Sequence, residues 1–200
     1  MEPNNEILCF SNTDLKLLKS VVGQKWQYVI GNHLTEAPGP SPFIFAWDDM
    51  VFSAGDEVLA VHSEMVERDF EGWKEIYPIL SIVAAGELAN RSDRTHHRYF
   101  QYKGETIEEV YVVRNEIRRF MNDVPSWKLI ADYGIVLKLD TGSMFIGKNN
   151  QRQEAMCARF ANNSDDAIWD DGWFSWAGEN DPGERFETKR KLIPINELIS

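Results

Sequence analysis

The chain has 200 residues, of which 43% are hydrophobic and 26% charged, so it can bury one sizeable core or two small ones. Its 32 acidic and 21 basic residues give a formal net charge of -11. This charge opposes attraction to phosphate, which excludes nucleic acid and anionic membranes as default partners. Cys9 and Cys157 both lie in apolar surroundings ("ILCF", "AMCARF"), so we expect buried free thiols rather than a disulfide framework or a thiolate metal site.

The first residues carry no targeting pattern. "MEPNNEILCFSNTDLK" has neither a basic region nor a long apolar stretch, and no run of 18 apolar residues occurs in the sequence. We therefore expect neither a signal peptide nor a membrane-spanning segment, and a cytoplasmic protein.

Four segments have the pattern of a helix. Thr13 and Asp14 can cap a short amphipathic helix that Gly23 would end. Within residues 64–77, "EMVERDFEGWKEIY", large apolar side chains recur at spacings of four, three and four. The other two candidates are residues 151–162, "QRQEAMCARFAN", and a last turn in "PINELIS", residues 194–200.

Strand patterns are more numerous than helix patterns. Short runs of branched and aromatic residues, most of them separated by Gly, Pro, Asn or Asp, occur at 25–30, 43–47, 57–63, 78–84, 97–102, 106–113, 135–139, 143–147 and 185–193. Glycine-containing turns at 54–56, 103–105 and 141–143 predict three hairpins. The sequence thus predicts an α+β fold of mainly antiparallel β-sheet with two to four short helices.

Two parts of the chain resemble each other. "YVIGNHL" at 28–34 is similar to "YVVRNEI" at 111–117, which places Asn32 and Asn115 at an offset of 83 residues. Asp49 and Asp132 have the same offset, and each precedes a strand, a glycine turn and another strand. One interpretation is an internal duplication into two related β-rich modules, residues 1–90 with the N-terminal helix and residues 98–200. The alternative is that both parts pack as a single domain.

The segment Leu139-Asp140-Thr141-Gly142-Ser143 follows an apolar strand and resembles the catalytic loop of the aspartic proteases. The resemblance covers about five residues, and in that family two such loops bring two carboxylates together. The matching turn in the first half reads Ser53-Ala54-Gly55-Asp56, with the Asp after the Gly. We therefore interpret Asp140 as the corner of a hairpin, with its side chain accepting a backbone N–H, and transfer no catalytic role to it.

The segment at 162–186 combines tryptophans with acidic residues. It does not fit a helix-loop-helix calcium loop, because the positions before Gly172 do not alternate oxygen ligands. In one interpretation the tryptophans anchor an irregular loop onto the sheets. In the other they form an exposed partner-binding surface made of Trp169, Asp170, Asp171, Trp173 and Trp176.

Local catalytic motifs are missing from the sequence. It has no phosphate-binding glycine loop, dinucleotide fingerprint, paired Cys-x-x-Cys, nucleophile elbow or zinc-protease histidine motif, so we expect no cofactor and no metal. We predict a non-catalytic module that binds a basic protein, such as an acidic inhibitor or immunity-type protein. The alternative is an enzyme or small-ligand binder whose site lies between the modules, lined by Asn32, Asp49, Asn115 and Asp132.

Overall fold

The computed structural model describes residues 4–31, 33–35, 43–46, 49–70, 73–85, 97–100, 104–148, 156–168 and 182–199. Its elements, in chain order, are β1 (Asn4–Leu8), α1 (Asn12–Ser20), β2 (Trp26–Gly31), β3 (His33–Thr35), β4 (Phe43–Ala46), β5 (Asp49–Ala54), β6 (Glu57–Phe70), β7 (Trp73–Ala84), β8 (His97–Phe100), β9 (Ile107–Met121), β10 (Val124–Leu139), β11 (Gly142–Lys148), β12 (Met156–Ala161), α2 (Ser164–Ala167), β13 (Glu184–Pro194) and α3 (Ile195–Leu198).

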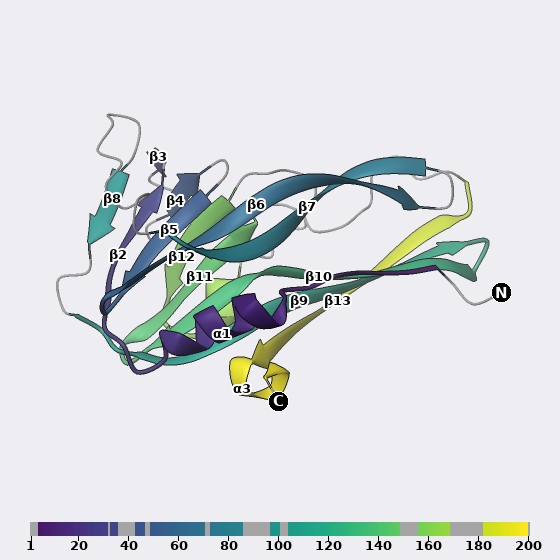
Figure 1. The fold of residues 1–200 in the computed structure, drawn as a ribbon. Helices are drawn as coiled ribbons and strands as arrows, with labels where there is room; N and C mark the ends of the chain where they lie inside the picture. Colours follow the sequence, from purple (N-terminus) through teal and green to yellow (C-terminus); the bar gives the residue numbers. More distant parts are fainter. Residues whose placement is uncertain are drawn as a thin grey trace.

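The strands form two sheets that face each other (Figure 1). The smaller sheet has the order β7-β6-β5-β2-β8, and the larger one has the order β13-β9-β10-β11-β12-β4-β3, with β1 beside β10. All pairings are antiparallel except that of β1 with β10, which is parallel. The prediction of a mainly antiparallel fold with few short helices is confirmed.

The main hydrophobic core lies between the two sheets. Fully buried side chains meet there from the smaller sheet, including Trp26 and Phe52, and from the larger sheet, including Val112 and Ile146. Helix α1 adds Leu18 to the same cluster. Because one core joins strands from both halves of the chain, neither half buries its apolar face alone.

Two hairpins, β6–β7 and β9–β10, are built from unusually long strands. Strands β6, β7, β9 and β10 have 14, 12, 15 and 16 residues, whereas typical strands have about five or six. The two hairpins extend together away from the main core, with β1 and β13 running along the lower one (Figure 1). A second apolar cluster ties them, because Tyr77 of β7 packs with Ile117, Trp127 and Leu129.

Both sheets contain the same five-strand arrangement. In each, four strands lie side by side in the order in which they occur along the chain, and the fifth returns to pair with the first, giving β8-β2-β5-β6-β7 and β13-β9-β10-β11-β12. In the first of these, β3 and β4 come between β2 and β5 in the chain and join the larger sheet. The register agrees as well: Val29 lies opposite Phe52 and Ile30 opposite Val51. At the offset of 83 residues these pairs become Val112 opposite Ile135 and Val113 opposite Gly134, which are the pairs formed by β9 and β10.

Two of the predicted helices are strands. The segment 64–77 falls in β6 and β7, and 156–161 forms β12. The first error has a geometric cause: Val66 pairs with Tyr77 and Phe70 with Trp73, so the helix-like spacing comes from cross-strand partners placed symmetrically about a hairpin. Residues 151–155 lie outside the described part.

The predicted C-terminal helix and two of the three predicted hairpins are present in the structure. A helix forms at 195–198, and the predicted turns around Gly55 and Thr141 each join two paired strands. The proposed hairpin at 103–105 is wrong, because β8 belongs to the smaller sheet and β9 to the larger one. The chain changes sheets at this point instead of folding back on itself.

Helix α1 has its N-cap two residues before the predicted cap Thr13 and is tied to the smaller sheet by Asp14. Ser11 is the N-cap, and its hydroxyl accepts a hydrogen bond from the backbone N–H of Asp14. The buried Asp14 carboxylate accepts the backbone N–H of Ser11 at 2.7 Å and that of Ile82 in β7, also at 2.7 Å. One carboxylate therefore caps the helix and satisfies a donor of an edge strand.

We expect Asp14→Ala to lower the free energy of unfolding by about 2 to 4 kcal/mol, because the helix loses its cap and the buried Ile82 N–H loses its acceptor. Urea unfolding followed by circular dichroism measures this change. The matched control is Asp140→Ala at an exposed turn, where we expect a change within about 0.5 kcal/mol. Equal effects of the two substitutions would contradict this role of Asp14.

Candidate functional site

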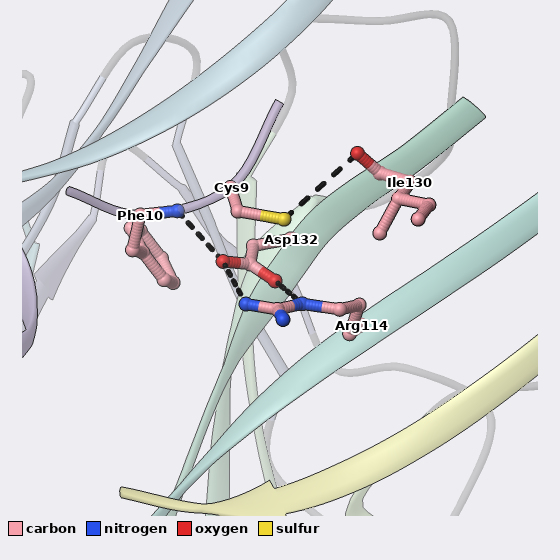
Figure 2. A network of polar contacts seen from close by, with 5 residues as sticks. All are labelled: Cys9, Phe10, Arg114, Ile130 and Asp132. Atoms are coloured by element: carbon pink, nitrogen blue, oxygen red, sulfur yellow. Dashed lines mark hydrogen bonds and ion pairs between the residues drawn. The ribbon is translucent and has the colours of Figure 1, made fainter. Parts of the chain in front are cut away.

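The strongest cluster of buried polar groups surrounds Asp132 on β10 (Figure 2). Its side chain is 1% exposed and accepts hydrogen bonds from the Arg114 guanidinium, at 2.7 Å from Nε to Oδ1 and 3.2 Å from Nη2 to Oδ2. The backbone N–H of Phe10 donates to Oδ2 at 2.7 Å. Both carboxylate oxygens are therefore occupied by donors of the same chain.

Strand register places these groups together. Arg114 of β9 lies directly opposite Asp132, so the two side chains share one face of the sheet. A register shift follows between Asp132 and Gly134, and an added Cβ at Gly134 would lie 2.6 Å from the carbonyl oxygen of Ile146. The glycine is needed because the backbones of β10 and β11 approach closely at this irregular point.

Cys9 is beside the carboxylate but is not activated by it. Its thiol points to the carbonyl oxygen of Ile130, with Sγ at 3.9 Å (Figure 2). Burial and the negative charge of Asp132 raise the pKa of the Cys9 thiol to about 11. Because the thiolate is the nucleophile, this site disfavours thiol chemistry near neutral pH.

Lys148, at the end of β11, is the buried cation of the region. Its residue is 1% exposed, its ammonium donates to the carbonyl oxygen of Pro78 in β7, and Nζ lies 4.3 Å from the centre of the Tyr77 ring. Burial lowers the pKa of Lys148 to about 7, and the charge of Asp132 acts in the opposite direction. The side chain thus joins the larger sheet to the edge of the smaller one.

The four residues of the predicted inter-module site are not all brought together. Asn115 and Asp132 lie on neighbouring strands, but Asn115 follows Arg114 and points to the opposite face, where its Oδ1 accepts from Arg190 Nε at 3.0 Å. Asp49 belongs to the smaller sheet and is 2.6 Å from His62 Nδ1. Asn32 lies outside the described residues.

Trp169, Asp170, Asp171, Trp173 and Trp176 all lie outside the described residues, between the end of α2 and the start of β13. At the hairpin of the protease-like segment, Asp140 is exposed in the turn between β10 and β11, with its backbone N–H bonded to the carbonyl of Thr106. The predicted hydrogen bond from a backbone N–H to its side chain is not among the contacts of the described residues.

The described residues contain no group of three or more His, Cys, Asp or Glu side chains that could hold a metal ion. Within the same ranges, no helix is long and apolar enough to cross a membrane. We found no protein family, curated protein or solved structure to which the chain is significantly similar.

Sequence reasoning identified Asp132 and Asn115 but missed the partners that define their surroundings. Arg114 stands next to Asn115 in the sequence, but the hairpin at Asn122 and Asp123 that places Arg114 opposite Asp132 was not predicted. Nothing in the sequence indicated that Lys148 is buried, because a lysine at the end of a strand is normally solvated. Its burial depends on β7, which is 70 residues away in the chain.

We expect Asp132→Asn to reduce the free energy of unfolding by about 3 kcal/mol or more, because it leaves the Arg114 cation without its charge partner. Replacing both residues, as Arg114→Leu with Asp132→Leu, should cost less than Asp132→Asn alone. Chemical unfolding of the variants tests this order. Asp49→Asn, at a half-exposed pair with His62, is the control and should cost less than about 1 kcal/mol.

Lys148 should make stability depend on pH. Between about pH 7 and the ordinary lysine pKa of 10.5, the folded chain holds a neutral amine while the unfolded chain still binds the proton. The free energy of unfolding should therefore rise with pH in this range, by up to about 1.4 kcal/mol per pH unit relative to Lys148→Met.

Unfolding curves of the wild type and Lys148→Met at several pH values provide this measurement. Lys138→Met on β10 is the control, because Lys138 is substantially exposed and pairs with Glu108 at the surface. A difference between wild type and Lys148→Met that stays constant with pH would show that the buried amine does not titrate as expected.

Proposed function

We propose that the chain is a non-catalytic protein-binding module, an acidic inhibitor or immunity-type protein whose partner is basic. The observation that carries this proposal is that the buried ionisable groups Asp132, Asp14 and Lys148 form their hydrogen bonds within the chain. The Asp132 oxygens and the Asp14 oxygens accept hydrogen bonds from the chain itself, and the Lys148 ammonium donates to Pro78. Groups that support the fold in this way are not available to a substrate.

The net charge supports a basic partner. A formal charge of -11 produces a negative field that speeds the encounter with a positively charged protein and repels acidic ones. The contact surface we propose is the segment with Trp169, Asp170, Asp171, Trp173 and Trp176. Tryptophan is enriched among the residues that dominate binding energy, and the adjacent carboxylates supply charge complementarity.

We also propose that the two β-rich modules arose by internal duplication. The common strand order and the common register of β2–β5 and β9–β10 support this proposal, together with the similarity of residues 28–34 and 111–117. The longer second hairpin fits an insertion, because its turn glycine needs an offset of 87 instead of 83, from Gly55 to Gly142.

The binding proposal predicts salt-sensitive capture of a basic protein. The immobilised wild type should retain such a partner from the native cell, and a variant with Asp170→Asn, Asp171→Asn, Trp173→Ala and Trp176→Ala should retain at least about tenfold less. The control variant carries Asp56→Asn and Glu57→Gln at the exposed turn after β5, which removes the same charge elsewhere. If wild type and variant capture the same proteins, this surface is not the contact.

A second candidate function is the binding of a small ligand, and one buried donor group without an acceptor in the described part of the chain favours it. The Nδ2 group of Asn115 is buried and has no hydrogen-bond partner among the described residues, although the Oδ1 atom of the same side chain accepts from Arg190. A buried donor without an acceptor is costly, and a ligand could supply one. In a thermal-shift screen, a ligand at this position should stabilise the wild type and not Asn115→Leu.

A further inference from the structure

Strand β13 forms one edge of the larger sheet. Among the described residues it pairs only with β9, so one row of its backbone N–H and C=O groups faces away from the sheet. The strand has 11 residues, about twice the typical length. Such an edge is long enough to accept another extended segment as an additional strand.

The charge of this edge is opposite to that of the whole chain. Strand β13, "ERFETKRKLIP", has four basic and two acidic residues, whereas the chain has a net charge of -11. Alternate residues share one face, and on this face Arg185, Glu187, Lys189 and Lys191 are all exposed. The opposite face is occupied by the fold, because Phe186 packs against Trp127 with ring centres 5.8 Å apart.

The neighbouring strands continue the same face with further cations. Glu187 lies opposite Arg118 of β9, and Arg118 lies opposite Lys128 of β10. The carboxylate of Glu116 is already shared, at 2.5 Å from Arg118 and 3.3 Å from Lys128. Lys189 is the cross-strand partner of Glu116, yet neither Lys189 nor Lys191 has an ion pair within the described ranges.

We propose that this basic edge, made of Arg118, Lys128, Arg185, Lys189 and Lys191, binds an acidic extended segment of another protein as a strand added to β13. The backbone edge supplies hydrogen bonds, and the exposed Lys189 and Lys191 supply charge complementarity on one face. This inference concerns a different surface and a partner of opposite charge, so it does not rest on the proposed function.

The same charges explain why an acidic segment is favoured over other occupants. Pairing with a second copy of β13 would bring two cation-rich strands together, and lysine and proline on an edge strand are known to prevent such association. The overall charge of -11 opposes nucleic acid, which has a uniformly dense negative charge. A short acidic segment experiences mainly the local positive charge, because salt screens the more distant acidic groups.

A fluorescent peptide of alternating glutamate and valine is the probe, with binding measured by anisotropy at low and at physiological salt. We expect Lys189→Glu with Lys191→Glu to weaken peptide binding by at least about tenfold. The matched control is Lys16→Glu with Lys19→Glu on α1, which changes the same two charges at exposed positions and should change binding much less. Amide hydrogen exchange of residues 184–194 should slow when the peptide is bound to the wild type.

Several results would overturn the proposal. They are failure of the wild type to bind the peptide, equal losses in both double variants, and binding without protection of β13. Equal binding of a peptide with glutamine in place of glutamate would also reject the charge argument. If a DNA duplex competes for the same lysines and binds more tightly than the peptide, the face belongs to nucleic acid instead.

Discussion

The hydrogen bonds accepted by the buried Asp132 carboxylate hold the N-terminal segment against the larger sheet, and the rest of the structure depends on them. The carboxylate holds Arg114 of β9 and the backbone N–H of Phe10, so it joins the centre of the larger sheet to the segment that leads into α1. Four residues later, Asp14 connects that helix to β7 of the smaller sheet. Two buried carboxylates thus set how the N-terminal segment spans the sheets, and the apolar core fills the space between them.

The backbone groups of the two edge strands β7 and β13 have different surroundings among the described residues. On β7, the N–H of Ile82 is satisfied by Asp14 and the carbonyl of Pro78 by Lys148, while Pro78 itself has no N–H to satisfy. Side chains therefore replace a missing neighbour strand. On β13 no comparable contact to the outer backbone row is present within the described residues, and charged side chains surround it. Within the described residues, the fold therefore covers the edge at β7 and leaves the outer row of β13 uncovered.

Much of the fold could be predicted from local patterns, but not the parts set by distant contacts. The strands at 25–30 and 143–147 and the turn at Gly55 follow from branched residues and glycine, and the structure contains them. The prediction of a helix at 64–77 was wrong because helical spacing and hairpin symmetry place apolar residues at the same intervals. For the site, Asp132 was singled out because it lies at the same offset from Asp49 as Asn115 lies from Asn32. The burial of Lys148 could not be predicted, since it depends on a strand remote in sequence.

The parallel pairing of β1 with β10 has a consequence for how the protein is made. Residues Asn4–Leu8 pair with Trp127–Ala131, so β1 finds its neighbour only after the long intervening stretch of chain and β10 have been synthesised. Until then Leu8 lacks the apolar cluster that later covers it. Contacts at such separation form slowly and leave apolar segments exposed in the meantime. Strand β1 therefore stays unpaired, with Leu8 uncovered, while the chain between it and β10 is being made.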